Sequence, residues 1–171
     1  MRIITTLFLL LSYFSYSQSV LRTPSINSQG TSIAFSYQGD IWTANLDGSN
    51  AKRLTVHSGY ESSPLWDKSG ENIAFSGNRN GNDDVYVMTK NGQSVKRLTY
   101  HPTNDGVTSW LNDNTLLISG NRSFRQVEWE SEINSVSIDG GTPELYLDAT
   151  GNMASASPSG KYIAFTKGFC R

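Results

Sequence analysis

The chain repeats one tripeptide three times, as Ile33-Ala34-Phe35, Ile73-Ala74-Phe75 and Ile163-Ala164-Phe165, with a weaker copy at Leu116-Leu117-Ile118. These copies are roughly 40 to 47 residues apart, a spacing that indicates a repeated supersecondary unit. Short runs rich in Ile, Val, Phe, Tyr and Thr recur between clusters of Gly, Asn, Asp and Ser. No window from Gln18 onward has the apolar spacing of a helix, so the sequence predicts an all-β fold.

Further markers keep the register of the tripeptide. Arg53-Leu54-Thr55 matches Arg97-Leu98-Thr99, and we interpret Glu144-Leu145-Tyr146 as a degenerate third copy. Turn signals recur in the same register at Asp47-Gly48, Asn91-Gly92 and Asp139-Gly140, because Gly and Asn tolerate the positive φ of tight hairpins. Each unit therefore contains four short strands, which in the second unit we expect near residues 62–66, 72–76, 84–89 and 95–99.

A four-stranded unit of this period is typical of a β-propeller blade. We predict a β-propeller of four-stranded antiparallel blades over residues 18–171, with blades near 20–56, 57–100, 101–147 and 148–171. A β-sandwich is the alternative, but a sandwich gives no reason for the sequence to repeat. The last unit contains only the expected strands 152–156 and 161–166. We therefore expect an incomplete propeller with three full blades and half of a fourth, which indicates a fragment or a truncated reading frame. The unpaired edge of the half-blade should make the chain prone to aggregation.

The first 17 residues differ from the rest. Arg2 is followed by an apolar stretch over residues 3–11, and Ser15 and Ser17 are small residues ahead of Gln18. This order predicts a secretory signal peptide over residues 1–17 and an exported, periplasmic or extracellular, protein. A membrane anchor is the alternative, although the stretch is shorter than the ~20 residues of a spanning helix.

Composition excludes several classes of function. Fourteen basic and 15 acidic residues give a formal charge of −1, which argues against nucleic acid as a partner. The single cysteine, Cys170, excludes an internal disulfide. We expect no cofactor.

The repeat resembles the propeller unit shared by TolB proteins and tricorn proteases, in which a Ser-Pro-Asp-Gly turn leads into Ile-Ala-Phe. The turn is best kept at Ser157-Pro158-Ser159-Gly160. Four runs in order look like the first propeller of tricorn-type peptidases, namely residues 37–42, 75–78, 84–88 and 97–102. The resemblance implies an N-terminal propeller that gates or binds peptide or protein substrates, with the serine nucleophile and histidine base of the tail-specific protease type in a domain outside this chain. It also implies an oligomer for the full-length protein.

The residues themselves indicate no catalytic site. There is no G-x-S-x-G sequence, and the two histidines, His57 and His101, occupy one repeat position, which favours structural loop residues over a general base. They also make a weak metal site, since no Cys or carboxylate lies at ligand spacing. Residues 78–84 have the oxygen density of a calcium loop but lack its closing Glu, so we interpret them as a solvated turn and expect no metal site.

The third unit departs from the others between its second and third strands. Residues 120–130 form a longer connection that contains Arg122, Phe124, Arg125 and Trp129. An insertion on one face of a repeat array is a common place for a binding loop, and a variable surface loop without function is the alternative.

Two further expectations follow. Aromatic residues at equivalent strand positions, including Trp66 and Trp110, should be buried between blades. The functional alternatives to a tricorn-like peptidase module are a non-enzymatic TolB-like propeller that binds a protein in the envelope, and a degenerate product without a stable fold.

Overall fold

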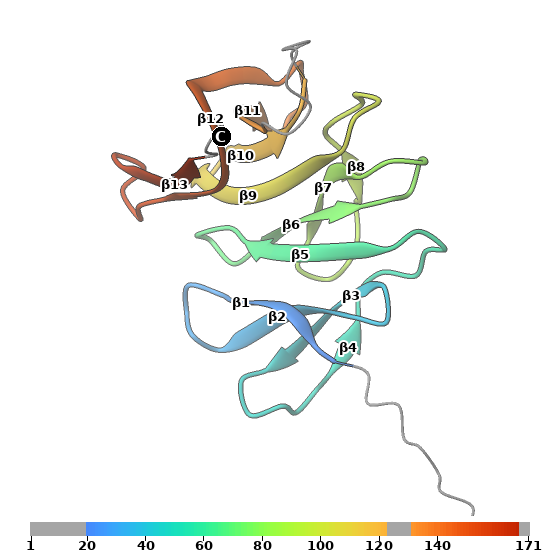
Figure 1. Cartoon of the computed structure of the whole chain (residues 1–171). Coiled ribbons are helices and arrows are strands. Elements are labelled where there is room, and N and C mark those ends of the chain that lie inside the picture. The colour runs from blue at the N-terminus through green and yellow to red at the C-terminus, as the bar shows by residue number, and fades with distance from the viewer. Residues whose placement is uncertain (1–19, 123–130, 168–171) are drawn as a thin grey trace, which may run out of the picture.

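A computed structural model describes residues 20–122 and 131–167 of the chain. All of the regular elements in these two ranges are β-strands, and neighbouring strands in each sheet run antiparallel (Figure 1). The predicted all-β class is therefore confirmed. The sheets follow one another along the chain as an open array that does not close into a ring, in agreement with the prediction of an incomplete propeller.

The first two blades each contain four strands in chain order. Blade 1 consists of β1 (Arg22–Ile26), β2 (Ser32–Tyr37), β3 (Asp40–Asn45) and β4 (Lys52–Arg53). Blade 2 consists of β5 (Glu61–Trp66), β6 (Asn72–Gly77), β7 (Asp84–Thr89) and β8 (Lys96–Arg97). The fourth strands are two residues long, shorter than the predicted 95–99, and carry an exposed lysine, which protects an open sheet edge.

Blade 3 shares one long strand with the half-blade that follows it. Its first three strands are β9 (Asp105–Asn112), β10 (Thr115–Gly120) and β11 (Glu132–Ser137). In β12 (Glu144–Ala156), residues 144–150 pair with β11, whereas residues 151–156 pair with β13 (Ile163–Lys167). The fourth (outer) strand of blade 3 thus continues directly into the first (inner) strand of the half-blade. The sequence had indicated two separate strands in this region.

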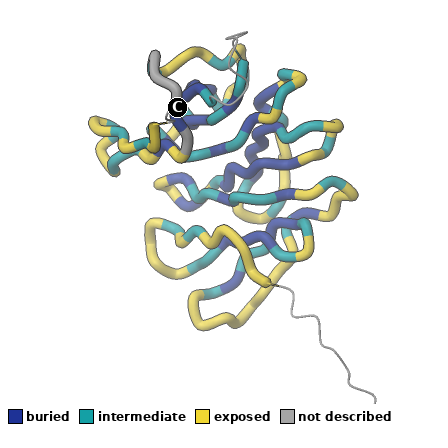
Figure 2. The backbone as a smooth tube through the Cα atoms, viewed as in Figure 1, coloured by how far each residue is buried: buried dark blue, intermediate teal, exposed yellow. Residues whose placement is uncertain are grey.

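The repeated tripeptide explains how the blades pack. In β6, Ile73 and Phe75 enter the apolar cluster between blades 1 and 2, whereas Ala74 enters the cluster between blades 2 and 3. All three side chains have no exposed surface. Because successive side chains of a strand point to opposite faces, one tripeptide serves two interfaces, and buried residues gather along the strands between the sheets (Figure 2).

Glycine at one hairpin position allows the turn between the first and second strands to repeat. Gly30, Gly70 and Gly160 have φ of 67°, 72° and 69° and close the hairpin between the first and second strands. In the second of these turns, Asp67 accepts hydrogen bonds from the backbone N–H groups of Glu71 and Asn72. A side chain at such a positive φ would be strained, which accounts for the glycine at each position.

An aspartate, an arginine and a threonine connect the third strand to the fourth. Asp84 is fully buried and forms an ion pair of 2.7 Å with Arg97. The Thr99 hydroxyl accepts a hydrogen bond from the Val85 N–H at 2.9 Å, and Arg97 donates to the Thr99 carbonyl at 2.8 Å. Asp40, Arg53 and Thr55 repeat these contacts in blade 1, so the Arg-Leu-Thr repeat fixes the outer strand.

In blade 3, our alignment of the third copy of this repeat is wrong by one residue. In blades 1 and 2, the arginine of the repeat pairs with an aromatic residue of the third strand, Arg53 with Trp42 and Arg97 with Tyr86. The equivalent residue of the third strand in blade 3 is Asn134, and it pairs with Leu145 rather than with Glu144. Pairing on β12 shifts register next to this point, and such a shift cannot be recognised from the letters of the sequence.

The two tryptophans differ in burial. Trp110 is 8% exposed and donates its indole N–H to the Leu65 carbonyl at 3.0 Å, whereas Trp66 is only partly buried beside the cluster of blades 1 and 2. The expectation of burial is therefore confirmed for Trp110 and wrong in degree for Trp66.

Replacement of Trp110 tests the packing between blades 2 and 3. We expect Trp110→Ala to lower the free energy of unfolding by about 3 to 5 kcal/mol, because it leaves a cavity between two sheets. Val56, which is 78% exposed, provides the control, and Val56→Ala should change that free energy by no more than about 0.5 kcal/mol. Denaturant unfolding of the full chain measures both, and equal effects would contradict the assigned interface.

Candidate functional site

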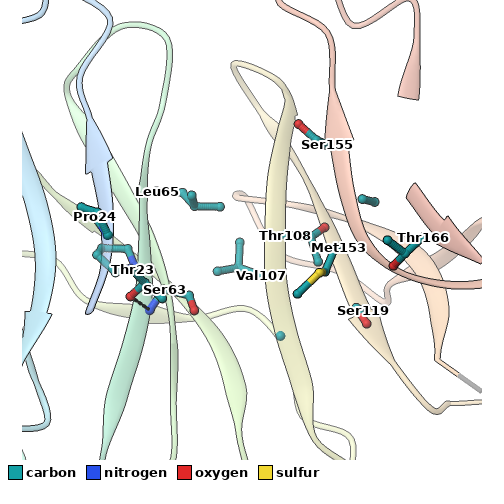
Figure 3. A pocket seen from close by; sticks show the side chains of 13 residues that line it. Thr23, Pro24, Ser63, Leu65, Val107, Thr108, Ser119, Met153, Ser155 and Thr166 are labelled. Atoms are coloured by element: carbon teal, nitrogen blue, oxygen red, sulfur yellow. Dashed lines mark hydrogen bonds between the residues drawn. The ribbon is translucent and has the colours of Figure 1, made fainter. Parts of the chain in front are cut away.

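A groove of about 690 Å³ crosses the inner strands, the first strands of the blades (Figure 3). Side chains from β1, β5, β9 and β12 line it, together with residues of β10 and β13. Figure 3 shows Leu65 and Val107 between β5 and β9, with Met153, Ser155 and Thr166 on the far side of β9. Its volume lies within the ~300 to 1,000 Å³ common for ligand sites, so this groove is the candidate functional site.

Three strands place a strained residue in the groove. Thr23, Ser63 and Met153 have φ of 47°, 55° and 55°, a left-handed conformation that costs non-glycine residues about 1 to 3 kcal/mol each. All three line the groove and lie at equivalent interruptions of strand pairing in β1, β5 and β12. Strain that recurs at the wall of one groove is a feature from which a function can be inferred.

Hydrogen bonds account for the first two of these residues. The Thr23 hydroxyl lies 2.8 Å from the Ser36 hydroxyl and accepts a bond of 3.1 Å from the Ser63 N–H. This contact links blade 1 to blade 2. Met153 has no such polar group and is 77% exposed.

Side chains of the groove are apolar or hydroxyl-bearing. Among the described residues that line it, none carries a charge. Acidic residues do begin β5 and β9, beside the groove, but each is engaged by an arginine. Glu61 pairs with Arg79 at 2.5 Å, and Asp105 pairs with Arg122 through both carboxylate oxygens.

Glycine makes room for these buried acids. A Cβ at Gly120 would lie 2.3 Å from Oδ1 of Asp105, and one at Gly77 would lie 3.3 Å from Cγ of Glu61. Arg79 also lies over the ring of Tyr86 at 5.1 Å. The sequence contains a signal for both pairs that we did not use, since Ser-Gly-Asn-Arg occurs at residues 76–79 and again at 119–122.

The structure places one of the four residues proposed for the binding loop. Arg122 has a side chain that is 14% exposed and bound to Asp105, so it belongs to the repeat and the departure from the repeat begins after it. Phe124, Arg125 and Trp129 lie outside the described residues. Their role in binding stays a prediction.

The remaining candidates have local contacts. Nδ1 of His57 accepts a bond from the Gly59 N–H at 2.8 Å, and Nδ1 of His101 lies 2.7 Å from the Thr103 hydroxyl. In the proposed turn, Asn80 donates to the Tyr86 hydroxyl and Asn82 to the carbonyls of residues 101 and 103. Over residues 20–122 and 131–167, no three His, Cys, Asp or Glu side chains form a group suited to a metal ion. The same ranges contain no helix long and apolar enough to cross a membrane.

Burial shifts the pKa of Asp84, the acid that pairs with Arg97. Loss of solvent raises the pKa of Asp84 above the ordinary value, and this effect outweighs the opposing attraction of Arg97. The charge of Asp105 acts in the same direction as burial. Exposed Asp47 shows the reverse, because hydrogen bonds from Ser49 lower its pKa.

Comparison with known proteins gives consistent matches. Residues 18–170 match the family described as "Tricorn protease N-terminal beta propeller domain". The "Putative Tricorn-like protease N-terminal subunit" of Sulfurisphaera tokodaii is 26% identical over 162 residues, which cover 92% of this chain and 80% of that protein.

Two solved structures share the fold. The putative TolB of Agrobacterium tumefaciens matches with a TM-score of 0.73 and 16% identity, over 87% of this chain and 54% of the other. Tricorn protease matches with a TM-score of 0.68 and 20% identity, over 82% of this chain and 14% of the other. The chain thus spans about half or less of these solved structures.

Removal of either inner arginine tests the buried pairs. We expect Arg79→Ala and Arg122→Ala each to lower the free energy of unfolding by about 3 to 5 kcal/mol, because each leaves a buried carboxylate without its partner. Lys90→Ala is the matched control, since Lys90 and Glu71 form a pair with side chains 44% and 61% exposed. Its loss should cost less than about 1 kcal/mol by urea denaturation. If Arg79→Ala and Arg122→Ala both changed the free energy of unfolding by less than about 1 kcal/mol, the assignment of Glu61 and Asp105 as buried, arginine-paired carboxylates would be wrong.

The raised pKa of Asp84 predicts a pH dependence. The folded chain binds a proton at Asp84 more readily than the unfolded chain, whose aspartate titrates near about 3.9. As pH rises from about 4 through the raised pKa of Asp84, its contribution to the free energy of unfolding therefore falls. Relative to Asp84→Asn, the unaltered chain should lose stability over this window, measured by urea unfolding against pH.

Asp47→Asn provides a control of opposite sign. Because the pKa of Asp47 is lowered, the unaltered chain should lose stability relative to this variant as pH falls below about 4. For each variant, the difference in the free energy of unfolding from the unaltered chain is plotted against pH. Slopes of the same sign for Asp84→Asn and Asp47→Asn would contradict the opposite pKa shifts of the two aspartates.

Proposed function

Because the chain belongs to the family of tricorn protease N-terminal β-propeller domains, we propose that it is the substrate-gating or peptide-binding module of an exported serine peptidase of this type. The nucleophile and base belong to a catalytic domain outside this chain. The groove on the inner strands carries the proposal, since it is large enough for a ligand and its wall contains strained residues.

A binding experiment tests the module. We expect the full chain to bind unfolded peptides, with fluorescein-labelled fragments of denatured casein as the probe and fluorescence anisotropy as the readout. Ser155 is exposed and lines the groove, so Ser155→Arg should weaken binding at least about tenfold by filling it. Exposed Ser58 does not line the groove, and Ser58→Arg should leave binding unchanged. Equal affinity of the two variants would contradict the proposed site.

A TolB-like protein-binding propeller is the second candidate, favoured by the fold match to the putative TolB. The same anisotropy experiment distinguishes the two functions. Binding of a folded envelope protein without binding of unfolded peptides would support the second candidate and contradict the first.

Export is part of the proposal and rests on the order of a charge, an apolar stretch and small residues over residues 1–17. We expect protein recovered from the secreted or periplasmic fraction to begin at Gln18, measured by N-terminal sequencing. Leu9→Arg interrupts the apolar stretch and should leave the chain uncleaved. A mature protein that still begins at Met1 would contradict the signal peptide.

A further inference from the structure

We propose that Asn80 is a modification site, at which the side-chain amide is lost spontaneously by cyclisation onto the backbone nitrogen of Gly81. Asn91 also precedes a glycine, and the fold protects it from the same reaction. The inference goes beyond the proposed function and does not depend on the groove. Two observations carry it: the N–H group of Gly81 is free, whereas the N–H group of Gly92 is held in a packed turn.

Asparagine followed by glycine has a short route to this reaction. The glycine nitrogen attacks Cγ of the asparagine, the new N–C bond closes a five-membered succinimide, and the side-chain nitrogen leaves as ammonia with the proton of the N–H group. Water then opens the ring at either carbonyl and gives aspartate or isoaspartate, so no other reactant is needed. Glycine has no Cβ to hinder the attack, and asparagine is among the thermolabile residues of proteins.

The chain contains this dipeptide at residues 80–81 and again at 91–92. A basic residue precedes each copy, Arg79 in the first and Lys90 in the second. Because the two sites are so similar in sequence, a difference in their reactivity must come from the folded structure.

The backbone of Gly81 is open to the reaction. In the part of the chain that the structure describes, its N–H group donates to no acceptor, and a Cβ built at Gly81 would meet no atom within 4 Å. Both Asn80 and Gly81 are exposed. Gly81 has a φ of 99°, which glycine adopts without strain, so the connection between β6 and β7 requires the glycine that makes Asn80 reactive.

A single printed contact restrains the Asn80 side chain. Its amide N–H donates to the Tyr86 hydroxyl at 2.9 Å, and a neutral hydrogen bond of this kind is weak beside water. The aspartate product keeps this partner, because a hydroxyl that accepts from an amide can donate to a carboxylate. Conversion of Asn80 to aspartate is therefore compatible with the fold.

The backbone of Gly92 is restrained in the turn between β7 and β8. Its N–H donates to the Thr89 carbonyl at 2.9 Å, and the Thr89 N–H donates to the Gln93 carbonyl at 2.9 Å. A Cβ at Gly92 would lie 2.6 Å from the Leu54 carbonyl oxygen, so this turn packs against blade 1. Cyclisation at Asn91 requires the turn to open first, which slows the reaction by the population of the open state.

The test measures both asparagines in one folded sample. The purified full chain is incubated at mildly alkaline pH, which favours loss of the glycine N–H proton, and is then digested with pepsin at acidic pH. Mass spectrometry follows the exchange of NH2 for OH in the peptides that contain residues 80 and 91, and an isoaspartyl methyltransferase detects isoaspartate. We expect Asn80 to react at least about tenfold faster than Asn91.

The chain unfolded in guanidinium chloride is the matched control. Its two Asn-Gly sites should react at rates within about twofold of each other, because the structure that distinguishes them is lost. Asn80→Gln should remove the fast product while the far-UV circular dichroism spectrum stays the same. Equal rates at Asn80 and Asn91 in the folded chain, a faster reaction at Asn91, or a reaction at Asn80 only after unfolding would each overturn the proposal.

Discussion

Burial of the second strand on both of its faces is the constraint on which this structure depends. In β6, Ile73 and Phe75 need blade 1 and Ala74 needs blade 3, so blade 2 cannot bury its own central strand. The partner surfaces are complementary in size, since small Ala34 of blade 1 lies in the cluster with Phe75. Repetition of the sequence follows directly, because each blade must present to the next the surface that its predecessor presented to it.

Ion pairs at both margins of the sheets add specificity to this packing. The outer pair of Asp84 and Arg97 fixes the fourth strand, and the inner pair of Glu61 and Arg79 fixes the chain that leaves the second strand. Burial of Asp84 is costly enough to raise its pKa, so these pairs are poor evidence of net stabilisation. Their effect is to exclude alternative registers, since a slip of one residue would leave a carboxylate buried alone.

The sequence predicted the fold class and the strands of blade 2 because those features depend on local alternation and on glycine at fixed turn positions, such as Gly70 and Gly92. It failed where pairing between distant strands decides the outcome. The offset at Leu145 follows a register shift on β12, which no local pattern announces. The long connection after the second strand suggested that Arg122 belongs to the insertion, but the repeated Ser-Gly-Asn-Arg and the ion pair with Asp105 place Arg122 in the repeat. The left-handed backbone at Met153 could not be predicted, because nothing in the residue type indicates it.

The scaffold therefore depends mainly on the second strands, whereas most residues of the groove lie on the first strands. The second strands keep Ile-Ala-Phe or a close substitute, since two neighbours constrain every position. The inner strands have one edge facing the groove. Their sequences, Arg-Thr-Pro-Ser-Ile in β1 and Glu-Ser-Ser-Pro-Leu-Trp in β5, share a hydroxyl residue followed by proline but differ in chemistry at the positions after it. A surface freed from the repeat can vary in chemistry without disturbing the packing of the blades. For this reason a family assignment, which depends on the repeated strands, identifies the scaffold, whereas the ligand must be inferred from the residues of this groove.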